Sequence, residues 1–396
     1  MKRILSAFLF ITLPFSTVAA TTWFVDARNG SNGYSGLSPS TPKRTIRAAV
    51  NAASGGDCIV VAGGVYNENV ILSKPLTLVS HDPAVAVIDG RHAGHCLLIT
   101  ENAAGCVVDG LAFTHGAPTN DGNKYGGGID CFADATIRHC VFRDNGNSST
   151  TFAGGLHTQN RSRVLVENCL FVGNYAWASG GATLTEGDSY ITFDRCTVYG
   201  NNSTDFIGNQ GGIVVTHGST GIVRNCILWG NSGMQLAAYG SWYGRDATVH
   251  VSYSCVQGGV APNGIGHFYD DGGNISADPR FLDVLRRNFW FRDDSPCWRC
   301  GHPDFFERDG LRCHMGYWSS RLRPPPPVVW TVEIALDPQG GDCSADVVER
   351  NLNDTIGLLP VPQCDGYDFL GWFDRADGGR REQMRPYGTR PRFRRG

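Results

Sequence analysis

Short runs of apolar residues alternate with small polar residues along most of the chain. The runs are four to six residues long and rich in Val, Ile, Phe and Thr, and Gly, Asn and Asp separate them. This pattern predicts many short β-strands joined by tight turns. No window carries a helical stripe over three turns, so the chain is expected to be all-β.

Two phrases recur with one period of just under thirty residues. The first occupies residues 137–145, 166–174, 193–201 and 223–231, and its cysteines are Cys140, Cys169, Cys196 and Cys226, with Cys255 following 29 residues later. The second is a Gly-Gly pair at 127–128, 154–155, 180–181 and 211–212. A shared period marks stacked supersecondary units. Strands at the same phase of successive units must pair in parallel, which predicts a right-handed parallel β-helix solenoid.

The repeat also predicts which side chains stack. The expected interior columns are Ile129, Leu156, Ala182, Ile213 and Ile137, Val166, Phe193, Val223. The phased cysteines form another column, either as buried thiols or with some adjacent pairs oxidised. Asn168 and Asn225 share one turn position, where stacked amides can satisfy backbone groups.

The first twenty residues predict a secretory signal peptide. Lys2 and Arg3 precede an apolar run over residues 4–15, and Val18-Ala19-Ala20 offers a cleavage site. The alternative is a buried N-terminal helix. No later segment is long and apolar enough for a membrane span. A net charge of −3 with 18% charged residues gives no indication of nucleic-acid binding.

The repeated phrases resemble those of polymorphic outer-membrane proteins and of secreted right-handed β-helix proteins. Residues 23–69 resemble the opening module of exported, pectate-lyase-like β-helix proteins, in which a helix, here at about residues 45–53, covers the open end. The resemblance implies an N-terminal cap and first coils over residues 21–100. The β-helix coils follow over residues 101–275.

The remaining residues divide into four segments. Residues 276–322 resemble the closing segment of bacterial surface β-helix proteins and are expected to cap the solenoid. A Pro-rich linker over 323–330 precedes residues 331–384, in which the string 366–373 resembles an internalin-type B-repeat, a small β-grasp-like module. Residues 385–396 form an Arg-rich basic tail.

Strand alternation predicts a polar patch on the outer surface. With Ile129 and Leu156 inside, Asp130, His157 and Thr183 are expected to point outward in one column, with Gln159 beside them. Asp130 and His157 are the catalytic candidates if the protein is an enzyme, and a solvated sheet face is the plainer interpretation. The turn aromatics Tyr125, Trp177 and Trp242 are candidates for stacking on sugar rings or for covering loops.

Other chemistry is weakly represented. The motif series of polygalacturonase-type hydrolases occurs only as fragments, namely His115-Gly116, His217-Gly218 and Asp270-Asp271. No acid cluster recurs coil by coil, although a lyase of this fold would use Ca²⁺ to neutralise a uronate carboxylate. One group of residues resembles the ligand set of a zinc site: Cys297, Cys300, Cys313 and His314. In an exported protein, however, the oxidising environment favours a disulfide there.

These patterns predict an exported or cell-surface protein that presents an extended face to a polysaccharide or cell-surface glycan, without a cofactor. The alternative is a polysaccharide lyase or glycoside hydrolase acting on an acidic polysaccharide. The absence of a complete catalytic motif series in the sequence favours binding.

Overall fold

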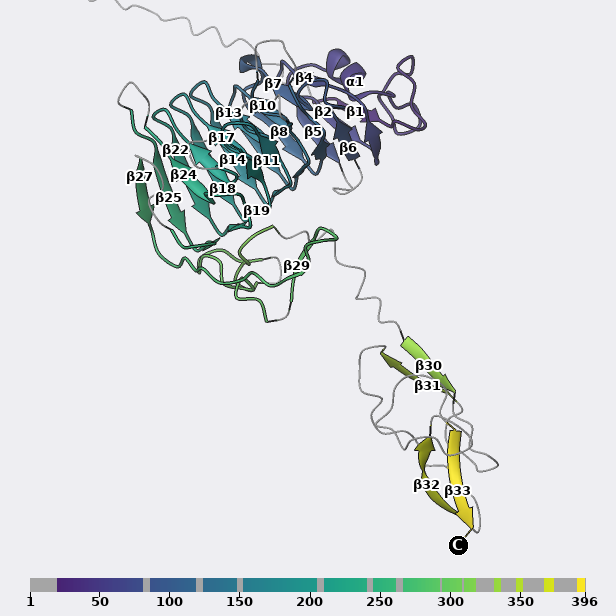
Figure 1. Cartoon of the computed structure of the whole chain (residues 1–396). Helices are drawn as coiled ribbons and strands as arrows, with labels where there is room; N and C mark the ends of the chain where they lie inside the picture. Colours follow the sequence, from purple (N-terminus) through teal and green to yellow (C-terminus); the bar gives the residue numbers. More distant parts are fainter. Residues whose placement is uncertain are drawn as a thin grey trace, which may run out of the picture. The chain divides into compact units, whose positions relative to one another are not determined.

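Three parallel sheets wind around one apolar interior, coil upon coil (Figure 1). The computed structural model describes residues 20–80, 86–118, 124–147, 152–204, 210–240, 245–260, 266–292, 294–307 and 310–317, with four further strands after residue 330. Residues 1–19 of the predicted signal peptide, the Pro-rich linker and Trp242 lie outside the described residues. The chain divides into two compact units, Met1–Arg321 and Leu322–Gly396.

Sheet A is the ten-stranded sheet of the solenoid. Its strands, in order, are β1 (Thr22–Val25), β2 (Cys58–Val61), β5 (Thr77–Ser80), β8 (Cys106–Asp109), β11 (Ala135–Arg138), β14 (Arg163–Glu167), β18 (Tyr190–Asp194), β22 (Thr220–Arg224), β25 (Thr248–Ser252) and β27 (His267–Asp270). Neighbours pair in parallel, as the shared phase predicts. Alternate side chains therefore point into the interior or out to the surface.

Sheet B has eight strands and sheet C has seven. Sheet B contains β3 (Gly64–Tyr66), β6 (Ala86–Asp89), β9 (Ala112–Thr114), β12 (Val141–Arg143), β15 (Leu170–Val172), β19 (Thr197–Tyr199), β23 (Ile227–Trp229) and β26 (Cys255–Val256). Sheet C contains β4 (Val70–Leu72), β7 (Leu97–Ile99), β10 (Ile129–Cys131), β13 (Leu156–Thr158), β17 (Thr183–Thr185), β21 (Ile213–Val215) and β24 (Leu236–Ala238).

One α-helix packs on the first coils. Helix α1 (Ile46–Ala52) begins at Thr45, whose side chain accepts a hydrogen bond from the Ala48 amide, as an N-cap residue does. Ile46, Ala49 and Val50 are buried in the same apolar cluster as the solenoid interior. The Glu68 carboxylate accepts from the Ile46 and Arg47 amides and completes the N-terminal capping. A short 3-10 helix, η1 (Glu101–Ala103), precedes β8.

The predicted cysteine column is present and fully buried. The amide of Cys140 donates to Sγ of Cys169, and the same contact links Cys169 to Cys196 and Cys196 to Cys226, at 3.4–3.5 Å. All four cysteines are free thiols. Ser254, not Cys255, occupies the next place, because its hydroxyl accepts from the Cys226 amide. The 29-residue interval to Cys255 is therefore one residue out of phase.

The amide stack lies at a different turn from the one predicted. Asn168 and Asn225 hold positive φ angles of 49° and 54° at the turn between sheets A and B, a conformation that Asn adopts readily. The stacked amides are those of Asn145, Asn174 and Asn201, which follow sheet B. Each donates from Nδ2 to Oδ1 of the next coil, ending at Asn231, with distances of 2.8–2.9 Å.

A flanking segment follows the last coil. It contains the antiparallel pair β28 (Phe281–Asp283) and β29 (Asn288–Phe291) and continues to residue 317. A small parallel pair, β16 (Tyr175–Ala176) with β20 (Asn202–Ser203), lies between coils. In the second unit the structure describes two antiparallel pairs, β30 (Thr331–Ala335) with β31 (Val347–Asn351) and β32 (Tyr367–Phe373) with β33 (Arg390–Arg395).

Candidate functional site

The outer face of sheet B from β12 to β26 is covered by the flanking segment. Outward side chains of sheet B, including Leu170 and Ile227, form one buried cluster with Phe281, Phe289 and Met315. An ion pair also ties the segment to the solenoid. Two guanidinium nitrogens of Arg287, between β28 and β29, contact the Asp144 carboxylate at 2.6 and 2.8 Å. This face is therefore closed to a large ligand.

The outer face of sheet C carries the predicted Asp130–His157 pair. The register places Asp130 opposite His157, and Nδ1 of His157 lies 2.7 Å from Oδ1 of Asp130. The prediction of an exposed patch is wrong, because both side chains are fully buried. The Tyr125 ring stacks on the His157 ring with centroids 4.6 Å apart, and the Phe152 ring stacks on Tyr125 in turn. Aromatic side chains therefore shield the pair from water.

The pair belongs to a longer chain of alternating imidazoles and carboxylates. Nε2 of His157 lies 3.4 Å from Oε1 of Glu186, whose other oxygen lies 3.3 Å from Nδ1 of His217. At the opposite end, Nε2 of His95 lies 3.9 Å from Oδ2 of Asp130. We call these five residues the imidazole–carboxylate chain. Its Glu186–His217 end is the more exposed one, with side chains 18% and 46% exposed, whereas the His95 side chain at the other end is 10% exposed.

Electrostatics favour an imidazolium at the centre of this chain. Burial alone would lower the pKa of His157, but hydrogen bonds to Asp130 and Glu186 and their negative charges raise it. Burial alone would raise the pKa of Glu186, but hydrogen bonding to His157 and the charges of His157 and His217 lower it. These contacts favour the protonated form of His157, whose Nδ1 lies against Asp130 and whose Nε2 lies near Glu186.

The strand register explains which predicted residues come together. Leu156 faces Thr183 rather than Ala182, so Thr183 points into the interior and Leu184 takes the outward place beside His157. The coils slip by one residue because the amides of Gly154 and Gly155 bond to the carbonyls of Gly180 and Ala182, which leaves Gly181 as an extra residue. The placement of Thr183 in the outward column is therefore wrong.

The remaining candidates fall into different environments. Gln159 is half-buried one residue beyond β13, as Glu186 is beyond β17. Trp177 is 49% exposed and Tyr125 is half-buried. The sequence reasoning missed Glu186 and His95, and it considered His217 only as part of a His-Gly fragment of the hydrolase motif series. Correct register would have shown Glu186, because it follows the strand that pairs with His157, whereas His95 and His217 lie in turns that strand alternation does not orient.

Sheet A is the face that stays accessible. Its central outward column runs through Val107, Thr136, Leu165, Thr192, Ile222 and His250, and each of these side chains is half-buried. A shallow groove of about 350 Å³ crosses this column, and its lining includes Asp134, Arg163, Leu165, Tyr190 and Thr192. Tyr190 is 38% exposed and lies on the strand next to Arg163.

The groove carries one charge of each sign. The Asp134 carboxylate accepts a 2.7 Å hydrogen bond from the Arg163 backbone amide. The Arg163 guanidinium makes no ion pair within the described part of the chain. The neighbouring charged row is paired instead, through Arg138 with Asp109 and Arg224 with Asp194. Arg163 therefore remains available to a ligand in the groove.

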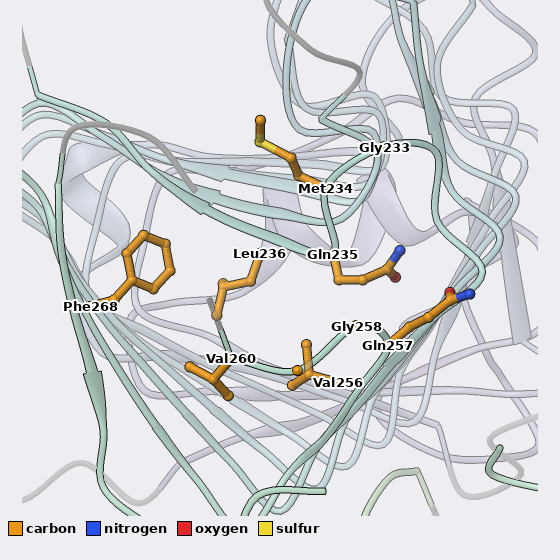
Figure 2. Close-up of a pocket in the computed structure, with 10 residues that line it drawn as sticks. Gly233, Met234, Gln235, Leu236, Val256, Gln257, Gly258, Val260 and Phe268 are labelled. Atoms are coloured by element: carbon orange, nitrogen blue, oxygen red, sulfur yellow. The ribbon is translucent and has the colours of Figure 1, made fainter. Parts of the chain in front are cut away.

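A second hollow lies at the last described coil. It measures about 190 Å³, and the apolar side chains of Leu236, Val256, Val260 and Phe268 gather around it (Figure 2). None of its lining residues is ionisable. Across the described ranges, no three His, Cys, Asp or Glu side chains are arranged to hold a metal ion, and no helix has the length and apolarity needed to cross a bilayer.

Comparison with known proteins agrees with this geometry. The family model for the right handed beta helix region matches residues 84–253. The protein is a right-handed parallel β-helix. Its similarity to a pectate lyase, Pel9A, is 13% in identity with a TM-score of 0.42, covering 75% of this chain and 96% of the lyase.

A pectin methylesterase from Aspergillus niger is likewise 13% identical, with a TM-score of 0.41, covering 71% of this chain and 93% of the esterase. A carrot pectin methylesterase is 16% identical, with a TM-score of 0.32, covering 61% and 75%. No curated protein gives a significant match. At these identities the likeness concerns the fold alone.

Proposed function

We propose that this chain is an exported β-helix protein that binds an extended glycan across the outer face of sheet A and does not turn it over. The single observation that supports this most is the groove of Arg163, Tyr190 and Thr192 on the sheet that remains accessible. The signal-peptide pattern, the B-repeat-like string after the Pro run and the adhesin-like role belong to the same proposal.

The groove has the composition that sugars require. A Tyr ring stacks on the apolar face of a pyranose while the Tyr hydroxyl remains hydrated. Arg163 donates hydrogen bonds and Asp134 accepts them, so sugar hydroxyls can meet both. The flat row of Thr136, Leu165 and Thr192 gives a long chain a surface without side chains that would block it. These features suit the binding of a sugar chain.

The alternative is a lyase or hydrolase acting on an acidic polysaccharide. Within the described residues, His217 is the most exposed member of the imidazole–carboxylate chain and the part that a polymer could approach most readily. An enzyme would release new reducing ends or unsaturated uronates from polygalacturonate, whereas a binding protein would release neither.

Affinity electrophoresis in gels containing polygalacturonate, xylan or a β-glucan tests the proposal. The native protein is expected to be retarded by at least one polymer. Tyr190→Ala should weaken that retention by up to about tenfold, because a stacked aromatic contributes about 0.5–1.5 kcal/mol. Tyr34→Ala, at a ring 46% exposed outside the groove, is the matched control. Equal retention of both variants, or turnover of any polymer, would overturn it.

A further inference from the structure

Cys255 occupies a different environment from the other repeat cysteines. Because Ser254 takes the place beneath Cys226, Cys255 pairs with Ile227 and points away from the column. Its side chain lies in the buried cluster that joins sheet B to the flanking segment, together with Cys297. The one-residue shift therefore turns this thiol toward residues about forty positions further along the chain.

The two thiols are neighbours. Cys255 and Cys297 lie within hydrogen-bonding reach of each other, and both are fully buried. Backbone contacts hold each side in place, because Sγ of Cys255 donates to the Ala277 carbonyl at 3.1 Å and the Cys297 carbonyl accepts from the Met315 amide at 3.0 Å. Ile227 and Phe291 belong to the same buried apolar cluster as the two thiols.

We propose that Cys255 and Cys297 form a disulfide that fastens the flanking segment to the last coil. The bond would join β26 to a segment that otherwise depends on apolar packing and on the Arg287–Asp144 ion pair. The proposal draws on the export that we propose for this protein, because such bonds persist in oxidising compartments. Its chemistry can be tested in vitro without any glycan.

The oxidant is a small disulfide such as oxidised glutathione. The thiolate of Cys255 attacks one glutathione sulfur, and glutathione leaves as a thiolate that takes up a proton. The thiolate of Cys297 then attacks the Cys255 sulfur of this mixed disulfide and displaces the second glutathione. Two protein thiols are oxidised, and one glutathione disulfide is reduced to two thiols.

Burial sets the order of events. Since both thiols are fully buried in the folded chain, glutathione cannot reach them once the flanking segment has docked. The bond must therefore form during folding. Oxidation should be rapid when the unfolded protein is refolded with oxidised glutathione and slow when the reduced native protein receives the same reagent.

Peptide mapping under non-reducing conditions tests the bond. The full chain is refolded with a mixture of reduced and oxidised glutathione, free thiols are blocked with iodoacetamide in denaturant, and the digest is examined by mass spectrometry. We expect one peptide pair joined through Cys255 and Cys297, lighter by two hydrogen atoms than its parts. Alkylation of both residues, or a bond from Cys297 to Cys300 instead, would overturn the proposal.

A stability measurement with matched variants keeps the test independent of any single mutant. Reductant should lower the urea midpoint of the oxidised native protein and leave Cys255→Ala and Cys297→Ala unaffected. Cys169→Ala, which removes a buried thiol of the column, should keep the response to reductant. A native protein that shows no response to reductant would contradict the bond. Glycan retention by the sheet A groove is measured separately. A failure of the disulfide proposal is therefore distinguishable from a failure of the proposed function.

Discussion

At the scale of single residues, His157 shows how a sequence feature typical of catalysis becomes a structural one. A histidine beside an aspartate in an exported β-helix protein suggests proton transfer. Here both imidazole nitrogens face carboxylates and an aromatic ring covers the pair. The His157 ring is thus fixed between neighbouring coils and shielded from water, an arrangement suited to stabilising the solenoid.

His157→Gln should change the pH dependence of stability. The pKa of His157 is raised by its contacts, so its contribution is fully present below the unfolded value of about 6.5 and is lost as the pH rises through the folded pKa. We expect the urea midpoint of the native protein to fall as the pH rises above about 6.5 and through the folded pKa. The midpoint of the variant should not show this fall. Urea titrations between about pH 5.5 and 9 measure it.

His250→Gln is the control, since His250 lies on sheet A and its only described ion-pair partner is a half-exposed Asp271. Its profile should follow that of the native protein. If His157→Gln keeps the native profile, His157 is not the charged centre of the imidazole–carboxylate chain. Glycan retention should be unchanged in His157→Gln, because the side chain is buried away from the groove.

At the scale of elements, the turns after sheet B depend on their stacked amides. The Asn174 side chain donates to Asn201 and to the Phe142 carbonyl, and it accepts from the Asn145 amide and side chain. Asn174→Ala would leave several buried polar groups unpaired, each costing about 1–3 kcal/mol. We expect a loss of about 2–4 kcal/mol in the free energy of unfolding, measured by urea denaturation.

Asn202→Ala is the matched control for this substitution. Asn202 lies in β20 of the next coil and its side chain is exposed, so its loss should change the free energy of unfolding by less than about 0.5 kcal/mol. Similar losses in both variants would show that the amide stack contributes little to stability.

The solenoid could be predicted from the sequence because a repeat fixes its strand pairing. Strand alternation also placed Asp130 beside His157. It failed at Thr183, where one extra residue at Gly181 reverses inside and outside, since side chains alternate with a period of two. Burial of the pair could not be predicted, because Tyr125 and Phe152 come from turns whose path over the sheet depends on tertiary packing.

At the scale of the whole molecule, the three outer faces of the solenoid differ in how much of each is covered. The flanking segment covers sheet B from β12 to β26. Turn aromatics and the imidazole–carboxylate chain cover part of sheet C, and sheet A stays accessible. The groove on sheet A was not predicted. Its residues carry no motif, and they meet only because coils about 27 residues apart lie one above another.

Removal of residues 328–396 should leave the melting of the first unit nearly unchanged. The described core of that unit ends with the flanking segment, and the chain separates into its two units at residue 322. Differential scanning calorimetry of the full and shortened chains measures the effect. The control deletion of residues 276–396 should lower the midpoint, because it exposes the apolar side chains of sheet B. A large drop in the first case would place the boundary elsewhere.

The stacked columns of thiols and amides also bear on how such a protein changes over evolutionary time. Each coil presents equivalent side chains above and below, with Asn174 bonded to Asn145 on one side and Asn201 on the other. A duplicated coil therefore finds the neighbours it already had. The outer face of sheet A can therefore lengthen by one coil at a time, about 4.8 Å each, while both ends of the solenoid stay the same. Duplication of coils within the gene would in this way adapt the length of the sheet A face to polymers of different length.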